Sequence, residues 1–193
     1  MALLPVTPPA GIVKNGTDYA NKGRWVDGNL VRFENGYLKT KNIFMINLIR
    51  TDSKNNDFIN LVTFLDADLK IRDGADHDFY DQFNKIDMLK HVVVAFENNV
   101  AIGCGAFKIH ENAVVEIKRM YVSPIGRRKG IASNVLTELE NWAKELKIEK
   151  CILETGKQQP EAIDLYKKCG YSITANFGFY ENVENSVCFE KFL

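Results

Sequence analysis

Three consecutive cations, Arg127, Arg128 and Lys129, stand directly before a segment whose apolar spacing predicts a helix. The amino end of a helix already carries a partial positive charge of about half a unit, so these side chains add like charge to like charge. Gly126 precedes them and Gly130 follows, and glycine lets an anion approach the backbone N–H groups closely. The pattern predicts a binding loop for phosphate or pyrophosphate. The alternative is a charged run that faces water.

The elements that would position this loop follow from hydrophobic periodicity. Residues 91–122 contain three predicted strands joined by tight turns at ENN and HEN, which is typical of an antiparallel meander. After Pro124, apolar residues spaced by three and four predict a helix. Its apolar stripe consists of Ile131, Val135, Leu139, Trp142 and Leu146.

Other periodic segments complete a domain from residue 43 to residue 193. Strands are expected at 43–50, 150–155, 171–174 and 185–193, and helices at 55–69, 76–84 and 160–169. Strands mixed with helices in this order predict an α+β fold, in which a twisted mixed sheet carries helices on its faces.

Composition excludes several classes of protein. The 193 residues include 25 Lys and Arg and 25 Asp and Glu, so no overall field favours nucleic acid or a membrane surface. No apolar run approaches the roughly 18 residues of a membrane span, and residues 1–11 lack the features of a signal peptide. We therefore expect a cytoplasmic protein.

Cysteine and histidine give no sign of a metal site. The four cysteines, at 104, 151, 169 and 188, include no C-x-x-C pair, which favours reduced thiols packed in a core over a disulfide framework or a zinc site. His77, His91 and His110 share no ligand spacing, so no metal is expected.

From about residue 45 onward, the sequence resembles the GCN5-related N-acetyltransferase (GNAT) family, which transfers acetyl from acetyl-coenzyme A to an amine. The pyrophosphate loop of that family has the pattern Gln/Arg-x-x-Gly-x-Gly/Ala, and residues 127–132, RRKGIA, fill it between a strand and a helix. Downstream, EAIDLYKKCGY at 161–171 matches the family segment A-I-x-L-Y-x-x-x-G-F/Y. The resemblance implies a GNAT-like twisted sheet flanked by helices.

The resemblance also implies where acetyl-coenzyme A would bind. In the family, the strand before the loop splays from its neighbour, and the pantetheine arm of the cofactor lies in the gap, hydrogen-bonded to main chain. Carried over, the implied cofactor-binding residues are Met120, Tyr121, Val122, Arg127, Arg128, Lys129, Gly130, Ile131 and Ala132. Many relatives have Asn about three residues before A-I, whereas this chain has Gln159, so the contact of Gln159 with the pantetheine arm stays open.

Acetyl transfer requires a polarised carbonyl and a proton for the departing thiolate. By resemblance, Tyr166 occupies the position of the general acid that protonates the coenzyme A sulfur. The alternative is a core aromatic on the apolar face of its helix. A main-chain N–H near Met120 or Tyr121 could hydrogen-bond the carbonyl oxygen as it gains charge, a contribution of about 3 kcal/mol in other acyl transfers.

The reaction also requires a deprotonated amine. Glu116 lies four residues before Met120 on a predicted strand, so both are expected on one face. A carboxylate there, with its pKa raised by partial burial, could take the proton of the incoming ammonium directly or through water. The alternative is a structural salt bridge with Lys118 or Arg119.

Residues 1–42 differ in composition from the rest of the chain. Three of the five prolines lie in the first nine residues, and KNG, NKG, DGN and ENG follow, which predicts an extended, turn-rich arm. The segment PPAGIVKNGTDYANKGRWVDGNLVRFENGYLKT resembles the amino-terminal segment of tail or neck structural proteins of tailed bacteriophages. This resemblance implies docking on a virion, with tail or neck proteins as partners. The alternative is an unrelated flexible extension.

Two functional hypotheses follow. In the first, the protein is an acetyl-coenzyme A-dependent N-acetyltransferase that acts on a small-molecule or peptide amine by direct attack in a ternary complex. In the second, it is a phage virion structural or adaptor protein whose GNAT-like domain has reduced or accessory activity. The expected location is the cytoplasm of a bacterium or phage-infected host, or the virion.

Overall fold

The structure is a computed structural model. It describes residues 46–74, 80, 82, 85–87, 89–110 and 113–193, together with the backbone of three earlier strands. Internal contacts divide the chain into two compact units, residues 1–45 and residues 46–193.

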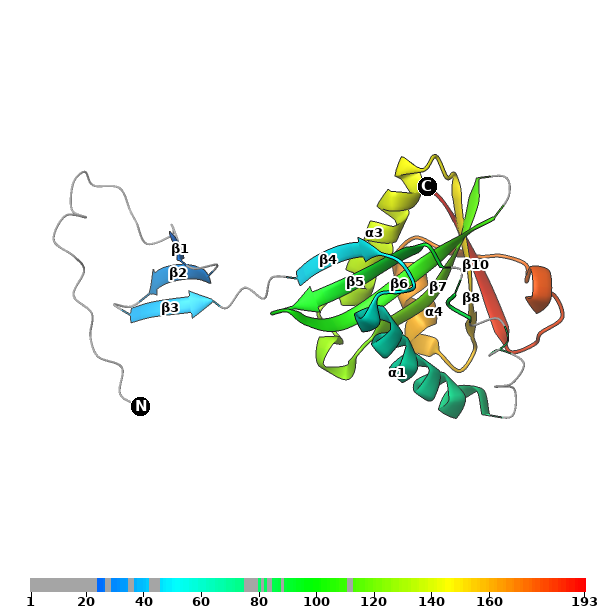
Figure 1. Cartoon of the computed structure of the whole chain (residues 1–193), viewed down its shortest axis with the longest axis horizontal. Coiled ribbons are helices and arrows are strands. Elements are labelled where there is room, and N and C mark those ends of the chain that lie inside the picture. The colour runs from blue at the N-terminus through cyan, green and yellow to red at the C-terminus, as the bar shows by residue number, and fades with distance from the viewer. Residues whose placement is uncertain are drawn as a thin grey trace. The chain divides into compact units, whose positions relative to one another are not determined.

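The first unit contains a three-stranded antiparallel sheet in the order β1-β2-β3 (Figure 1). Its strands are β1 (Arg24–Val26), β2 (Asn29–Glu34) and β3 (Tyr37–Lys41). The expectation of an extended arm did not include these strands. In the sequence, Asp-Gly and Asn-Gly separate them, and these pairs are strong signals for a hairpin when β-favouring residues flank them.

The second unit is built on a seven-stranded sheet in the order β4-β5-β6-β7-β8-β10-β9 (Figure 1). Neighbouring strands are antiparallel except β7 and β8, which run parallel, so the predicted mixed sheet is confirmed. The strands are β4 (Ile46–Thr51), β5 (His91–Glu97), β6 (Val100–His110), β7 (Val114–Val122), β8 (Lys150–Gly156), β9 (Ser172–Ile173) and β10 (Ser186–Phe192).

Three helices of this unit are α1 (Asn56–Asp73), α3 (Ile131–Glu145) and α4 (Pro160–Lys168). The side chain of Asn55 caps α1 by accepting a hydrogen bond of 2.9 Å from the backbone N–H of Phe58. Helix α1 runs four residues beyond its predicted end. Of the helix predicted at 76–84, only residues 80 and 82 are among the described residues, and His77 also lies outside them.

The helices cover opposite faces of the sheet. Alternate residues of β5 show this: Val92 and Val94 pack in a cluster with α1, whereas Val93 and Ala95 pack in a larger cluster with α3 and α4. The predicted apolar stripe of α3 begins at Ile131, which is 1% exposed. In Figure 1, α1 lies in front of the sheet and α3 behind it. The core therefore has two layers of side chains, one on each face.

The sheet opens between β7 and β8. These strands pair only from Val114 to Glu116 on β7 and from Lys150 to Ile152 on β8. Beyond these pairs, β7 continues to Val122 without a ladder partner on its β8 side. Main-chain donors and acceptors along that edge are consequently open to another partner.

A β-bulge precedes the end of β7. Two residues of β7, Arg119 and Met120, oppose the single residue Gly105 on β6, and Arg119 has a positive φ of 57°. Gly105 fits beneath this bulge because a Cβ there would overlap the Met120 sulfur. The bulge changes which face of the sheet the last residues of β7 occupy.

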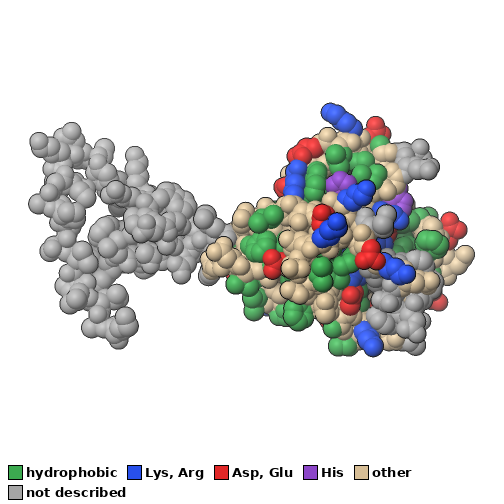
Figure 2. Space-filling view, in the orientation of Figure 1, with side chains coloured by type: hydrophobic (Ala, Val, Ile, Leu, Met, Phe, Trp, Pro, Cys, Tyr) green, Lys and Arg blue, Asp and Glu red, His purple; other side chains and the backbone are tan. Residues whose placement is uncertain are grey.

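Charges of both signs lie on the surface. Figure 2 shows Lys and Arg side chains interspersed with Asp and Glu on the visible face of the second unit, in keeping with a net charge of zero. Within the described parts of the chain, no helix is long and apolar enough to cross a membrane.

Candidate active site

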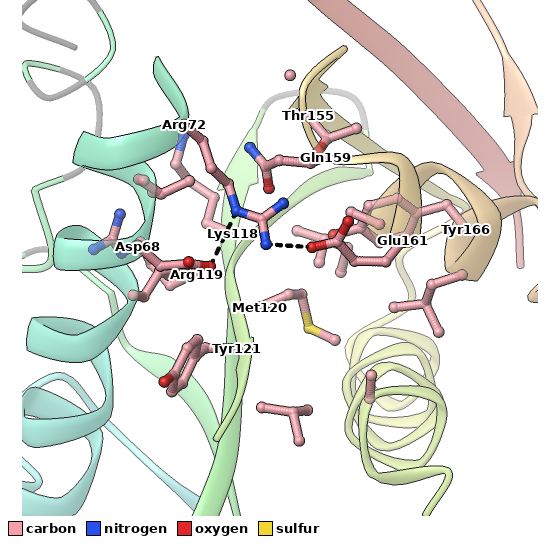
Figure 3. A pocket seen from close by; sticks show the side chains of 18 of the residues that line it. Asp68, Arg72, Lys118, Arg119, Met120, Tyr121, Thr155, Gln159, Glu161 and Tyr166 are labelled. Atoms are coloured by element: carbon pink, nitrogen blue, oxygen red, sulfur yellow. Dashed lines mark hydrogen bonds and ion pairs between the residues drawn. The ribbon is translucent and has the colours of Figure 1, made fainter. Parts of the chain in front are cut away.

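A cavity of about 590 Å³ lies where β7 and β8 separate. Its walls come from α1, β7, the turn before α3, β8 and α4, and Figure 3 shows side chains that line it. It is lined by every predicted site residue except Lys129. The predicted site residues that line the cavity are thus up to about fifty positions apart in the sequence.

The loop at 126–132 forms one end of the cavity. Gly130 precedes α3 with a φ of 77°, and it has no side chain with which to cap the first N–H groups of that helix. Arg127 and Arg128 line the cavity, and Arg127 Nε donates a hydrogen bond of 3.2 Å to the carbonyl oxygen of Val122. The free helix N–H groups and two guanidinium groups make this end suited to an anion.

Lys129, which is predicted to bind the cofactor, is not among the residues that line the cavity. Its Nζ forms a salt bridge with Glu97, with distances of 2.7 and 2.9 Å to the two carboxylate oxygens. The preceding residue, Arg128, has a positive φ of 63°. This left-handed conformation changes the direction of the backbone between Arg128 and Lys129. Of the three consecutive cations, only the two arginines face the predicted anion site.

Glu116 and Met120 do not lie on one face of β7, contrary to the expectation from their spacing. The bulge adds a residue between them and reverses the alternation. Lys118, two residues after Glu116, pairs with Ala106, which packs in the cluster with α1, whereas Met120 packs against the α3 cluster. Both residues still line the cavity because it passes through the opening of the sheet.

Both carboxylate oxygens of Glu116 have hydrogen-bond partners. Lys118 Nζ donates to one oxygen at 2.8 Å, and His110 Nε2 lies 3.1 Å from the other. The residue is 7% exposed. The predicted salt bridge with Lys118 is present, whereas Arg119 forms a salt bridge with Asp66 on α1.

Glu154 on β8 is another of the carboxylates that line the cavity, and the sequence did not single it out. Ser186 Oγ on β10 donates a 2.6 Å hydrogen bond to Glu154 Oε1. Burial raises the pKa of Glu154 to about 7, an effect that Ser186 and Lys118 oppose and the charges of Glu116 and Asp73 reinforce. A side chain in this state can exchange a proton near neutral pH.

Only one sequence signal could have pointed to Glu154. In the strand KCILETG, buried residues alternate with partly exposed ones, and Glu154 is the acidic residue on the less buried side. Its register with β10 and its distance from the opening of the sheet depend on pairings far apart in the sequence, such as Glu154 opposite Cys188.

Tyr166 on α4 is 5% exposed and lines the cavity. Its ring contacts those of Tyr171 and Phe189, with ring centroids 5.8 Å apart in each pair. It therefore contributes to the core and also faces the cavity. Burial raises its pKa well above the usual value for a phenol, so the hydroxyl keeps its proton at neutral pH.

Arg72, near the end of α1, links α1 to α4 across the cavity, as the dashed lines in Figure 3 show. Its Nε lies 3.2 Å from Asp68 and its Nη2 lies 2.6 Å from Glu161, while Nη1 donates to the carbonyl oxygen of Gln158 at 3.2 Å. Gln159, the predicted pantetheine contact, lines the cavity beside this bridge.

The other candidate groups have structural surroundings. His91 stacks on Phe107 with ring centroids 4.4 Å apart and meets the edge of Trp142, and burial lowers its pKa. Among the described residues, no group of three or more His, Cys, Asp or Glu side chains could hold a metal. The four cysteines are free thiols: three are buried and Cys169 is partly buried.

Comparison with known families agrees with this geometry. The family model described as the acetyltransferase (GNAT) family matches residues 60–171, which include both motifs that suggested the resemblance. The chain belongs to this family. The amino-terminal unit lies outside the matched range.

Individual relatives give the same result. An IAA acetyltransferase of Azospirillum brasilense is 35% identical over 100 residues, which cover 51% of this chain and 65% of that protein. YsnE of Bacillus subtilis (strain 168), described as an uncharacterised N-acetyltransferase, is 35% identical over 99 residues, or 50% of this chain and 66% of its own. The chain therefore matches slightly less than two thirds of the length of these relatives.

A solved structure supports the fold assignment over a longer range. The crystal structure from Klebsiella pneumoniae described as an acyl-CoA N-acyltransferase has a TM-score of 0.66 and 27% sequence identity. The similarity covers 77% of this chain and 98% of that chain. The shared fold therefore spans most of this chain and nearly all of that one.

Proposed function

We propose that the protein is an N-acetyltransferase that takes acetyl from acetyl-coenzyme A and transfers it to a primary amine by direct attack in a ternary complex. The main observation is the course of the cavity. It begins at the anion-favouring loop 126–132, passes along the unpaired edge of β7, and reaches Glu116, Glu154 and Tyr166 where the sheet opens. Membership of the GNAT family supports the same reaction.

The residues present fit acetyl-coenzyme A as the co-substrate. The backbone N–H groups at the start of α3, which follow Gly130, would hold the pyrophosphate of acetyl-coenzyme A together with Arg127 and Arg128. The unpaired edge of β7 at Met120, Tyr121 and Val122 would hydrogen-bond the amides of the pantetheine arm as an added strand does. The bound co-substrate supplies the acetyl group as a thioester.

The two faces of the sheet would divide the proton transfers. Tyr166 packs in the cluster on the α3 and α4 face, whereas Glu116 and Glu154 lie toward α1. In the reaction, a bond forms between the amine nitrogen and the acetyl carbon while the carbon–sulfur bond breaks. A carboxylate first accepts one proton from the ammonium. As the thiol leaves, the Tyr166 hydroxyl donates its proton to the sulfur, and the second proton that the nitrogen loses as the amide forms restores the tyrosine, directly or through water.

The carbonyl oxygen requires a hydrogen-bond donor as it gains charge. The bulge at Arg119 and Met120 takes main-chain groups of β7 out of its ladder with β6 at this point of the cavity. We assign this role to a backbone N–H at Met120 or Tyr121. A preorganised donor of this kind contributes about 3 kcal/mol in other acyl transfers.

A screen with purified protein tests this function. Acetyl-coenzyme A is incubated with pools of small amines and peptides, and the released thiol is measured along with the acetylated product. We expect thiol release that depends on both the protein and an amine. Absence of amine-dependent release across the pools, with coenzyme A binding intact, would leave the chain as a binding protein.

A second proposal concerns residues 1–42, whose sequence resembles phage tail and neck proteins. We propose that this segment docks the enzyme on a partner, which would be a tail or neck protein if the chain is a virion component. The support is the sequence pattern and the separation of residues 1–45 as a unit. In the absence of such a partner, the enzyme would act in the cytoplasm.

A further inference from the structure

We propose that Glu154, positioned by Ser186, is the carboxylate that accepts the proton of the acceptor ammonium, and that Glu116 modulates it through its charge. This inference rests on the proposed acetyl transfer. It assigns the base to a residue outside the sequence motifs, in place of the carboxylate expected from its position on β7.

The first argument is the position of Glu154 beside the opening of the sheet. The last residues that pair β7 with β8 are Glu116 and Ile152, and Glu154 is the second residue after Ile152. It pairs with Cys188 on β10, so its backbone is held by the sheet on the side away from the opening. Its side chain lines the cavity that Tyr166 also lines.

The second argument is the difference in hydrogen bonding between the two carboxylates. A proton placed on either oxygen of Glu116 would meet an existing partner, the ammonium of Lys118 at 2.8 Å or the ring nitrogen of His110 at 3.1 Å. On the Lys118 side, taking up a proton would therefore disrupt a charge-assisted hydrogen bond. Glu154 instead accepts a hydrogen bond from a neutral hydroxyl, that of Ser186 at 2.6 Å.

Ser186 is itself held in place. Ser186 is 5% exposed, and the hydroxyl oxygen of Tyr80 lies 3.2 Å from Ser186 Oγ. When Ser186 donates its proton to Glu154, its oxygen can accept the proton of Tyr80. The chain Tyr80–Ser186–Glu154 thus orients the carboxylate without adding a positive charge.

The groups around Glu154 also suit this role. Burial, the largest effect, raises its pKa to about 7, with Ser186 and Lys118 lowering it and the charges of Glu116 and Asp73 raising it. The neighbouring titratable groups Tyr166, Tyr180 and Cys188 all have pKa values raised by burial, so they stay neutral near pH 7. Activity should therefore rise as the pH increases through about 7, because Glu154 must be deprotonated to accept a proton.

The experiment compares the pH dependence of kcat/KM in four variants. Glu154→Gln should remove the rising limb near pH 7. Glu116→Gln should keep the limb and move it to lower pH, because the charge that raises the Glu154 pKa is gone. Ser186→Ala should move it to higher pH, because the lost hydrogen bond favoured the carboxylate. Glu190→Gln, which alters a β10 carboxylate paired with Lys150 outside the cavity, should leave the limb in place.

The loss of kcat/KM in Glu154→Gln should depend on the basicity of the acceptor amine. The probes are ethylamine and 2,2,2-trifluoroethylamine, which have similar size but very different affinity for a proton. With ethylamine at neutral pH, we expect Glu154→Gln to lower kcat/KM by about 10²-fold, within the usual range for loss of a general base. With the weakly basic amine, which is already unprotonated, the loss should be at least tenfold smaller.

Two results would overturn the assignment. One is a rising limb that survives in Glu154→Gln and disappears in Glu116→Gln. The other is an equal loss with both amines, which indicates a structural role. If Glu154→Gln does not fold, the opposite shifts in Glu116→Gln and Ser186→Ala still decide, since shifts in the same direction contradict the proposal.

Failure of the proposed function can be distinguished from failure of this inference. If the wild-type protein acetylates neither probe nor any amine of the screen, the transferase proposal fails. Carbon-13 NMR of protein labelled at the glutamate carboxyl then tests Glu154 alone. A resonance that titrates near pH 7 and is absent in Glu154→Gln supports the assigned proton exchange, and its absence from wild-type spectra contradicts it.

Discussion

The two ends of the cavity are built in different ways. The loop end is one continuous segment, residues 126–132, and its chemistry comes from backbone N–H groups at the start of α3 and from adjacent arginines. The acid–base end is assembled from side chains on β7, β8, α4 and β10, which the sheet brings together. The loop end should therefore depend on backbone conformation, whereas the other end should depend on single side-chain atoms.

The largest expected effect lies at the acid–base end. Tyr166→Phe keeps the aromatic packing with Tyr171 and Phe189 and removes only the hydroxyl. We expect kcat to fall by about 10²-fold, because the departing thiolate loses its proton donor. Binding of coenzyme A, measured by calorimetry, should change little. Unchanged turnover would assign Tyr166 to the core alone.

The pKa of Tyr166 sharpens this test. Burial raises the pKa of Tyr166, so its hydroxyl keeps the proton at every pH below that raised pKa. The wild-type rate should consequently show no falling limb from Tyr166 between pH 6 and 9, a range below the usual phenol pKa of about 10. A decline within that range that vanishes in Tyr166→Phe would contradict the raised pKa.

At the loop end, the backbone conformation should matter most. Gly130→Val adds a β-branched residue at a φ of 77°, where a Cβ would have nothing within 4 Å, so the penalty is conformational and not steric crowding. A cost of about 1.4 kcal/mol or more would weaken coenzyme A binding by about tenfold. The control is Gly170→Val, at a φ of 86° outside the cavity, which should cost stability but leave Kd unchanged.

Normal coenzyme A binding by a folded Gly130→Val protein would contradict the loop assignment. Equal weakening in Gly130→Val and Gly170→Val would show that the effect comes from general destabilisation. Thermal unfolding of both variants, followed alongside the calorimetric titration, separates these results.

A smaller effect should separate the cations of the loop. Arg128 lines the cavity, whereas Lys129 forms a salt bridge with Glu97. Arg128→Gln should weaken coenzyme A binding by up to about fivefold, the range of an exposed charge pair, and should reduce the salt dependence of binding. Lys129→Gln should have the weaker effect on both quantities. The reverse order would return Lys129 to the cofactor site.

The sequence predicted the elements around the loop end well, because their signals are local. The strand before the loop, the glycine at its end and the apolar stripe of α3 are all read within about thirty residues, and the structure places most of them as expected. One exception is Leu146, which follows the last residue of α3 and is 42% exposed. Another is Lys129, whose partner Glu97 lies thirty-two positions away. No local pattern reports such a pair.

The acid–base end was predicted less well because it depends on strand register. The spacing of Glu116 and Met120 implied one face, but a bulge shifts the register and places them on opposite faces. Glu154 lies beside the cavity because β7 and β8 stop pairing after three residues each. A bulge and an opening of the sheet are properties of two or three strands together, so a single strand sequence does not reveal them.

The smallest expected effect concerns the segment before the domain. Residues 1–45 form a separate unit, and the first 42 carry six basic and three acidic residues with few periodic apolar positions. A chain that begins at Ile43 should unfold cooperatively at nearly the melting temperature of the full chain and bind coenzyme A with the same Kd, because the cavity is lined by residues beyond 64. In the full chain without a partner, we expect protease to cut first within residues 1–42, because their sequence is rich in turn residues and cleavage concentrates in turn-rich segments. The docking proposal adds that a partner should protect the same segment. If this segment resists protease in the free protein and its removal lowers the melting temperature sharply, then it is part of the catalytic domain, and the docking role is wrong.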